Sequence, residues 1–170
     1  MPPNFYAVAV VTMDGKIAKN SAHFSDWSSK EDKDFLHKKM NDSDVILVGN
    51  NTYKIAKKPL SKRNCIVFTS SVPKTKKAKE NLLYCNPKKI DFKKLILDLG
   101  YKKICVLGGA KTYGYFLEKN LLNEIFLTIE PIVFGSGISL FDFDAGIKKF
   151  KLVSVKKLNK KGAVLLHYKK

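Results

Sequence analysis

Short apolar runs rich in β-branched residues recur along the chain, separated by stretches with a different period. The runs read "FYAVAVVT", "DVILVG", "NCIVFTS", "KICVLGG" and "NEIFLTIEPIV". Runs of this length and composition are typical of strands that are buried on both faces, as in a parallel sheet. The pattern therefore predicts a sheet built mainly from short, buried strands.

Between these runs lie segments with the apolar spacing of amphipathic helices. We expect helices over Ser28 to Met40, Asn51 to about Lys57, Asp91 to Leu99 and Ala110 to Lys119. The C-terminal stretch "FKLVSVKKLNKKGAVLLHYKK" has two extended runs around an "NKKG" turn, which predicts an antiparallel hairpin. This order predicts one three-layer α/β domain over residues 1–170, in which about four helices flank a mixed sheet of about eight strands.

The composition agrees with a single globular domain. A hydrophobic content of 45% in 170 residues is enough for one well-filled core. No apolar run approaches membrane-spanning length and the start lacks the features of a secretory signal, so we expect a cytoplasmic protein with no membrane partner. Cys65, Cys85 and Cys105 are widely spaced, which favours buried thiols over a disulfide framework or a metal site.

A formal net charge of +17 makes a polyanion the first partner to consider. Of the 32 basic residues, however, only Arg63 is an arginine, and the lysines are scattered through nearly every segment. Scattered lysine is typical of a solvated surface, whereas phosphate and base recognition use the planar guanidinium. We therefore expect no specific nucleic-acid partner and keep a non-catalytic polyanion-binding module as an alternative of a different class.

The stretch "WSSKEDKDF" contains two neighbouring acids, Glu31 and Asp32, between aromatic residues. Ser28 and Glu31 have the spacing of a capping box at a helix start. The other interpretation is that one acid points into an apolar pocket, where a carboxylate is costly unless a ligand uses it. Local sequence leaves both interpretations open.

Two strand ends carry residues suited to binding phosphate. "VLGGAKTY" runs from an apolar strand through Gly108 and Gly109 into a helix, and "LVGNNTYK" repeats the arrangement at another strand end. Free backbone amides at a helix start bind anions, and a dinucleotide has two linked phosphates. Arg63, the lone arginine, precedes another buried strand, and its fork-shaped guanidinium suits a carboxylate or phosphate ligand or a structural salt bridge.

Together these pieces resemble the dihydrofolate reductase fold family, which includes the riboflavin-biosynthesis reductase domains. The resemblance covers nearly the whole chain. It is carried by "VVTMDGKIA", "WSSKEDKDF", "DVILVGNNTY", "KPLSKRNCIVFTSS", "VLGGAKTYGYFLEKNLLNEIFLT" and "EPIVFGSGISLF". It implies a reductase that uses NADPH.

The resemblance also implies a pterin site. It places the pterin-binding acid at Glu31, which shares a helix face with Phe35, while Asp32 is the second choice. Thr128 matches the threonine that supports this acid, and Trp27 would help to close the pocket and order a water. The remaining contacts implied for a folate are Val10 with the pterin, Leu60 with the aminobenzoyl ring and Arg63 with the glutamate carboxylate.

For the cofactor, the resemblance implies that Ile17 and Ala18 flank the nicotinamide. The segment implied to hold the pyrophosphate and ribose comprises Leu107, Gly108, Gly109, Ala110, Lys111, Thr112 and Tyr113. A second phosphate-binding helix opens with Asn50, Asn51 and Thr52, and the adenosine 2′-phosphate would lie at Thr69 and Ser70. The family often has arginine where this chain has Asn50, so Lys74 or Lys76 would supply that charge.

The leading interpretation from the sequence is NADPH-dependent reduction of 7,8-dihydrofolate to tetrahydrofolate, an enzyme of one-carbon metabolism. The alternative is a riboflavin-biosynthesis reductase that acts on a ribosylamino-pyrimidine phosphate. "MDGKIA" and "GSGISLF" favour this alternative, in which Arg63 would bind a phosphate. No single segment indicates an oligomeric interface.

Overall fold

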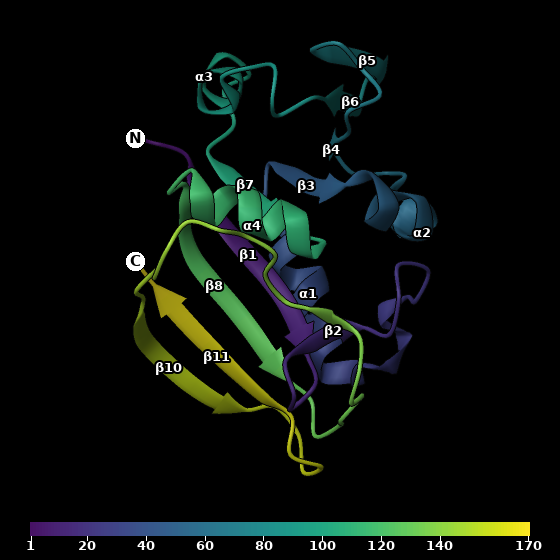
Figure 1. Ribbon diagram of the computed structural model, residues 1–170, viewed down its shortest axis with the longest axis vertical. Coiled ribbons are helices and arrows are strands. Elements are labelled where there is room, and N and C mark those ends of the chain that lie inside the picture. Colours follow the sequence, from purple (N-terminus) through teal and green to yellow (C-terminus); the bar gives the residue numbers. More distant parts are fainter.

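A computed structural model describes residues 1–170, apart from the side chain of Ser25. Its main sheet has nine strands in the order β10-β11-β8-β1-β7-β3-β4-β6-β5 (Figure 1). The strands are β1 Asn4–Val11, β3 Val45–Gly49, β4 Cys65–Phe68, β5 Thr75–Lys79, β6 Leu82–Cys85, β7 Lys103–Val106, β8 Leu122–Ile129, β10 Lys151–Lys157 and β11 Val164–Lys169. A separate antiparallel pair consists of β2 Lys16–Ala18 and β9 Ile138–Ser139.

The centre of the main sheet is parallel. Strands β8, β1, β7, β3, β4 and β6 run in one direction, with registers such as Ala7 opposite Val106 and Val10 opposite Thr128. β11 and β5 run antiparallel to their neighbours β8 and β6. The carboxyl ends of the parallel strands therefore meet along one side of the sheet, which we call the carboxyl edge.

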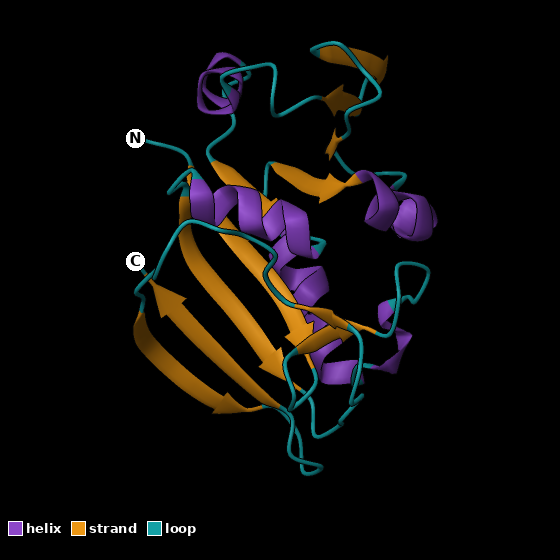
Figure 2. Cartoon of the chain, viewed as in Figure 1, coloured by secondary structure: helices purple, strands orange, loops and turns teal.

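Helices cover both faces of this sheet (Figure 2). They are α1 Lys30–Asn41, α2 Asn50–Leu60, α3 Phe92–Asp98 and α4 Ala110–Glu118, preceded by a short 3-10 helix over Ser25–Trp27. One core cluster packs α3 and α4 on the face formed by residues such as Phe5 and Leu47. The other packs α1 and α2 on the face of Tyr6 and Val48, so the domain has three layers.

The predicted fold class and its four helices are confirmed, but the strand list was incomplete. The hairpin of β5 and β6 was not predicted, because "TKKAK" has no apolar position and all five residues of β5 are exposed. The cap of α1 also differs: the Ser29 side chain, not that of Ser28, accepts a hydrogen bond from the Asp32 amide. The prediction of buried thiols is confirmed at all three cysteines.

The two outer strands of the sheet differ in character. β5 presents three lysines on an exposed edge. At the other edge, all seven residues of β10 are exposed, and they include Leu152, Val153 and Val155. Within residues 1–170, no helix is both long and apolar enough to cross a membrane.

Candidate functional site

The carboxyl edge brings together several segments that are far apart in the sequence. β3 leads directly into α2, and β7 leads into α4 through a short link. β1 and β8 end side by side, so that Thr12 and Glu130 follow neighbouring strands. Polar and glycine residues therefore gather where ligands of open α/β sheets bind.

The starts of α2 and α4 lie next to each other. The N-cap residues are Gly49 and Gly109, and no described side chain caps either helix. The Gly49 amide donates to the carbonyl of Gly108 over 2.7 Å, and the peptide between Gly108 and Gly109 is cis. Two helix starts with free amides form a cradle for anionic groups, which we call the glycine cradle.

The three glycines of this cradle serve different purposes. A β-carbon on Gly49 would lie 2.7 Å from the Thr112 hydroxyl oxygen, and one on Gly108 would lie 2.6 Å from the Tyr113 ring. Gly108 also has a φ of +89°, a conformation that favours glycine. At Gly109 the nearest atom would be the Thr52 hydroxyl oxygen at 3.4 Å. A side chain at Gly109 is therefore compatible with the fold and would fill the cradle.

Other residues of the predicted cofactor segment divide into exposed and buried groups. Lys111 is exposed, Leu107 is half-buried, and Ala110 and Thr112 are buried. Tyr113 belongs to the core: its hydroxyl donates to the Val8 carbonyl over 2.8 Å, and burial raises the pKa of its phenol. Because its polar atom is already bonded, Tyr113 supports Gly108 from behind and is not placed to contact a cofactor directly.

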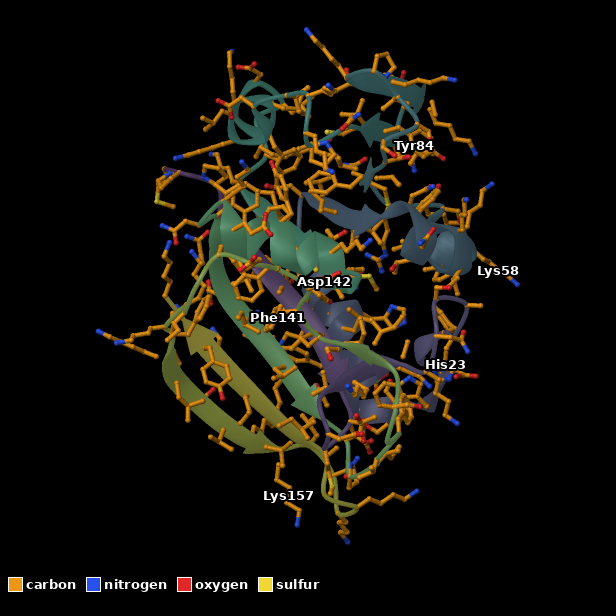
Figure 3. The ribbon with its side chains drawn as sticks, viewed as in Figure 1. His23, Lys58, Tyr84, Phe141, Asp142 and Lys157 are labelled. Carbon is orange, nitrogen blue, oxygen red and sulfur yellow. The ribbon has the colours of Figure 1, made fainter. Side chains whose placement is uncertain are left out.

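The segment after β9 covers α4 on the outside. Phe141 and Asp142 lie in front of this helix in Figure 3. The Asp142 amide donates to the Ala110 carbonyl over 3.2 Å, and a β-carbon on Gly114 would meet the Asp142 carbonyl. This close approach fixes the first turn of α4, which forms half of the glycine cradle.

The buried acid of α1 is Asp32. Its side chain is 4% exposed and accepts hydrogen bonds from the hydroxyls of Thr128 and Ser28. Burial raises the pKa of Asp32, an effect that these hydrogen bonds partly offset and the nearby Glu130 carboxylate reinforces. The predicted support of the acid by Thr128 is therefore present, but at Asp32.

The expectation that Glu31 points into an apolar pocket is wrong. Its side chain is exposed and accepts a hydrogen bond from the Asn159 side chain over 3.2 Å. The helical repeat explains the difference, because Asp32 lies one and two turns before Leu36 and Met40, and Met40 is buried. The line through Glu31 instead leads to Phe35 and to the charged Lys39.

Glu130 is a second buried acid that was not predicted. It is 4% exposed, and its carboxylate accepts from the backbone amide of Ser29 over 2.8 Å and from the Ser29 hydroxyl. The period of two along β8 was an available signal, because Phe126, Thr128 and Glu130 fall on one buried side. The helix start of α1 is thus tied to the end of β8.

Trp27 and Phe134 pack against each other. Their ring centroids are 5.1 Å apart in an edge-on arrangement. The Trp27 indole nitrogen is buried, and no described group accepts a hydrogen bond from it. The predicted role of Trp27 in closing a pocket and ordering a water stays a prediction.

The other predicted substrate residues are spread over the α1 and α2 side of the sheet. Val10 is half-buried and lies opposite Thr128 in the sheet. Phe35 packs on Phe126 with ring centroids 5.6 Å apart, and Leu60 is a core residue. Leu60 is only 3% exposed, so it offers little surface to a ligand.

Arg63 and the glycine cradle lie at opposite ends of the parallel strands. It precedes β4 at the amino end of that strand, and β4 alone spans about 13 Å. Among the described side chains, no carboxylate forms an ion pair with Arg63. The structural salt bridge considered for this arginine is therefore not observed, and its guanidinium is half-exposed.

The remaining predicted cofactor residues lie along the carboxyl edge. Ile17 and Ala18 belong to β2. Asn50, Asn51 and Thr52 form the first turn of α2. Thr69 and Ser70 follow β4, where the Thr69 hydroxyl accepts from the Ser71 amide over 3.1 Å and shapes a tight turn. Of these residues, Thr52 lies beside Gly109 of the glycine cradle. Contact of any of them with a cofactor stays a prediction.

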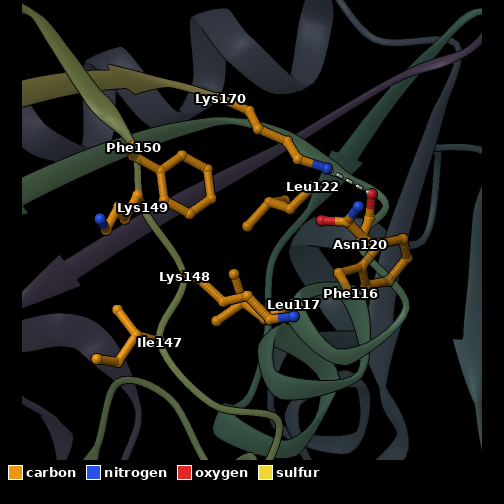
Figure 4. A pocket seen from close by; sticks show the side chains of 9 residues that line it. All are labelled: Phe116, Leu117, Asn120, Leu122, Ile147, Lys148, Lys149, Phe150 and Lys170. Carbon is orange, nitrogen blue, oxygen red and sulfur yellow. Dashed lines mark hydrogen bonds between the residues drawn. The ribbon is translucent and has the colours of Figure 1, made fainter.

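A hollow in the described surface lies elsewhere. It has a volume of about 340 Å³ and opens beside the C-terminal end of α4 (Figure 4). It is lined by Phe116, Leu117, Asn120, Leu122, Ile147, Lys148, Lys149, Phe150 and Lys170. The Lys170 ammonium donates to the Asn120 carbonyl over 3.0 Å. The hollow is therefore separate from the carboxyl edge.

A mixed α/β sheet with glycine-capped helices and a buried acid at its carboxyl edge defines a domain of the dihydrofolate reductase-like class. Within that class the chain belongs to the RibD C-terminal domain family, which it matches over residues 4–65 and 59–164. Among curated proteins it is 28% identical to the uncharacterized protein YwjB of Bacillus subtilis, over 93% of this chain and 92% of that protein.

Solved structures with the same fold include riboflavin-biosynthesis proteins. A pyrimidine reductase-like protein from Corynebacterium diphtheriae has a TM-score of 0.78 at 18% identity, covering 98% of this chain and 91% of that one. RibD from Acinetobacter baumannii has a TM-score of 0.77 at 16% identity, covering 99% of this chain and 58% of that one. This chain thus spans little more than half of that longer protein.

The expectation of a dihydrofolate reductase is wrong. The family that matches is that of the RibD C-terminal domain, and the structural relatives are named for riboflavin biosynthesis and pyrimidine reduction. A dihydrofolate reductase of Ureaplasma parvum is 31% identical, but over 107 residues that cover 62% of this chain and 63% of that enzyme. The alternative of a riboflavin-pathway reductase agrees with these findings.

Proposed function

We propose that this protein is an NADPH-dependent reductase that acts on a ribosylamino-pyrimidine phosphate. The observation that carries the proposal is the placement of a buried acid, Asp32, on the same edge of the sheet as the glycine cradle. The glycine cradle suits a dinucleotide, and the buried acid suits a polar heterocycle. The membership of the RibD C-terminal domain family supports the choice of substrate class.

The residues of the cradle fit the pyrophosphate of a dinucleotide. The free amides at the starts of α2 and α4 would hold its oxygens, and Thr52 and Thr112 place hydroxyls beside Gly109 and Gly49. NADPH supplies a hydride when it is bound, and Ile17 and Ala18 of β2 would lie against its nicotinamide ring. Asn50, the first residue of α2, would face the adenosine end.

Asp32 has the properties of a group that orients a pyrimidine and holds a proton. Transfer of a hydride to the substrate must be accompanied by a proton, and an acid with a raised pKa retains its proton closer to neutral pH. The hydroxyls of Thr128 and Ser28 fix the position of the carboxyl group. Arg63 has no ion-pair partner among the described side chains but lies at the amino end of β4, away from the glycine cradle, so its use for the substrate phosphate stays the prediction made from the sequence.

The proposal is tested by following NADPH absorbance with purified protein and 5-amino-6-(5-phosphoribosylamino)uracil. We expect one NADPH to be consumed for each molecule of ribitylamino product, which chromatography would identify. Dihydrofolate serves as the comparison substrate, and we expect no turnover with it. Binding of NADPH without reduction of the phosphoribosylamino compound would contradict the substrate assignment, and absence of NADPH binding would contradict the whole proposal.

A further inference from the structure

Residues 130–139, which we call the strap, cross the carboxyl edge between β8 and β9. The strap is held at its start by Glu130, which accepts two hydrogen bonds from Ser29. In its middle, the Met13 amide donates to the Ile132 carbonyl over 2.8 Å. At its end, Ile138 pairs with Ala18 in the small sheet.

Asp14 connects the strap to the loop that follows β1. One oxygen of its carboxylate accepts from the Thr12 hydroxyl over 2.6 Å and from the Phe134 amide over 3.2 Å. The other oxygen accepts from the Gly135 amide over 2.8 Å. The hydrogen bond from Thr12, with those from the two strap amides, holds the pKa of Asp14 below its ordinary value, so the group is ionised at neutral pH.

The Asp14 side chain is itself held in place by a tight turn. The Gly15 amide donates to the Thr12 carbonyl over 2.9 Å, and the Lys16 amide donates to the Thr12 hydroxyl over 2.9 Å. Thr12 is buried, with 1% of its surface exposed. A buried residue at the end of β1 thus fixes the carboxylate that grips the strap.

The strap approaches β2 closely. Gly137 has a φ of +147°, and a β-carbon there would meet the Ala18 carbonyl. β2 has three residues and pairs with the two residues of β9. A pair this short has too few ladder hydrogen bonds to hold its own shape. The hydrogen bonds of Asp14 add to this pairing, together with those from the Leu140 amide to the Gly15 carbonyl over 3.2 Å and from the Lys16 ammonium to the Ser139 hydroxyl over 3.3 Å.

We propose that Asp14 is a positioning residue that locks the strap against β2 and thereby sets the wall that Ile17 and Ala18 present to the nicotinamide ring. This inference rests on the proposed use of NADPH and adds the group that shapes its reactive end. Asp14 acts through the strap and does not touch the cofactor. Removal of its carboxylate leaves two strap amides without their acceptor and frees β2 to move.

Trp27 provides a readout that does not depend on the cofactor. It is the only tryptophan of the chain, and its ring packs on Phe134, whose amide is held by Asp14. The Phe134 ring also contacts His23, with centroids 5.6 Å apart. A strap that leaves its position therefore exposes Trp27 to water, which shifts its emission to longer wavelength and increases quenching by acrylamide.

The experiment compares Asp14→Ala and Asp14→Asn with wild type, and Asp98→Ala serves as a control that removes an exposed carboxylate from α3. In the cofactor-free protein, we expect Asp14→Ala to raise the acrylamide quenching constant of Trp27. The Kd for NADPH, measured by energy transfer from Trp27, should rise about tenfold because two charge-assisted hydrogen bonds are lost. Asp14→Asn keeps one acceptor oxygen and should fall between Asp14→Ala and wild type.

The outcomes separate this inference from the proposed function. Failure of wild type to bind NADPH would overturn the proposed function, whereas unchanged quenching in Asp14→Ala would overturn the inference even if NADPH binds. Loss of cooperative unfolding in both Asp14 variants would also overturn it, since Asp14 would then be needed for folding. Gly137→Ala, which displaces the strap by a clash with β2, should reproduce the quenching and Kd changes with Asp14 intact.

Discussion

Glu31 and Asp32 are neighbours in the first turn of α1, and the helix gives them opposite surroundings. Successive residues of a helix point about 100° apart, so only one of the two can face the sheet. Asp32 is buried and meets Thr128 and Ser28, whereas Glu31 meets Asn159 at the surface. The chemistry that we assign to an acid therefore belongs to Asp32.

We expect Asp32→Asn to lower kcat by roughly 100-fold or more, the range found for positioned proton donors. Glu31→Gln is the matched control, because it makes the same chemical change one residue away on an exposed side chain. NADPH affinity should be retained in both variants. Steady-state kinetics with the phosphoribosylamino substrate measure the effect, and an equal loss in Glu31→Gln would refute the assignment.

Asp32 also predicts a pH-dependent stability. Folding raises the pKa of Asp32. Its contribution to the free energy of unfolding is therefore complete below the ordinary pKa of 3.8 and is lost as pH rises through the raised pKa. At neutral pH the ionised carboxylate thus disfavours the folded state. We expect Asp32→Asn to increase the free energy of unfolding at pH about 7, with the gain shrinking towards pH about 4. Urea unfolding at several pH values measures this, and a gain independent of pH would contradict it.

Substitution of Arg63 is expected to change the affinity of the protein for its substrate. Arg63→Lys replaces a bidentate fork by a point charge, so KM for the phosphorylated substrate should rise about tenfold while kcat changes less. The dephosphorylated substrate should be used equally well by variant and wild type. Lys62→Gln is the control for loss of a neighbouring surface charge. If Arg63→Lys raises KM for both substrates alike, the guanidinium does not bind the phosphate.

The sequence was sufficient to predict which segments gather at the carboxyl edge, but not which of their side chains are buried there. Thr128 and Gly109 were placed correctly because a strand period and a strand-to-helix turn each fix a position. Its shared helix face with Phe35 favoured Glu31, whereas the line through Asp32, Leu36 and Met40 is the one that is buried against the sheet. Asp14 was overlooked because its partners, Phe134 and Gly135, are about 120 residues away in the chain.

At the scale of elements, the glycine cradle depends on two helices that start without side-chain caps. We expect Gly109→Val to raise the Kd for NADPH at least about tenfold, because the added side chain fills the space between α2 and α4. The melting temperature should change little, since Gly109 has a φ of −71° that any residue can adopt. Ala78→Val, on the exposed strand β5, is the control. Unimpaired binding would remove the cradle from the cofactor site.

Elements were predictable where burial imposes a pattern and unpredictable where it does not. The parallel strands are apolar on both faces, so their runs stand out in the sequence. β5 is held by β6 alone, and its exposed side chains carry no period. β2 and β9 are held by Asp14 and the strap, so their positions depend on contacts that a local pattern does not contain.

At the scale of the whole molecule, the charge of +17 creates an attractive field for anionic ligands. NADPH and a phosphorylated substrate both carry negative charge. We expect their KM values to rise several-fold as the ionic strength increases from about 0.1 M to about 1 M, because the Debye length falls from about 10 Å to about 3 Å. An uncharged osmolyte at matched viscosity is the control, and equal effects of salt and osmolyte would exclude the field as the cause.

The fold alone could not decide between the two reductases. A parallel sheet that feeds glycine-capped helices serves any reductase with a dinucleotide cofactor, and Asp32 suits a pterin as well as a pyrimidine. The family match decided the question in favour of the RibD C-terminal domain family. The distinguishing signals in the sequence were "MDGKIA", which contains Asp14, and "GSGISLF", which begins with Gly135, and these two residues share a hydrogen bond.

The two outer strands of the sheet have a consequence for how copies of this chain can meet. Linear growth by strand pairing requires both edges of a sheet to accept a partner. β5 carries lysines that would repel a like-charged neighbour, while β10 exposes apolar side chains and an unpaired backbone. Contact through β10 uses the same edge on each copy and leaves no second edge to extend. Edge pairing would therefore stop at a closed pair, which protects a concentrated solution of the protein from forming fibres.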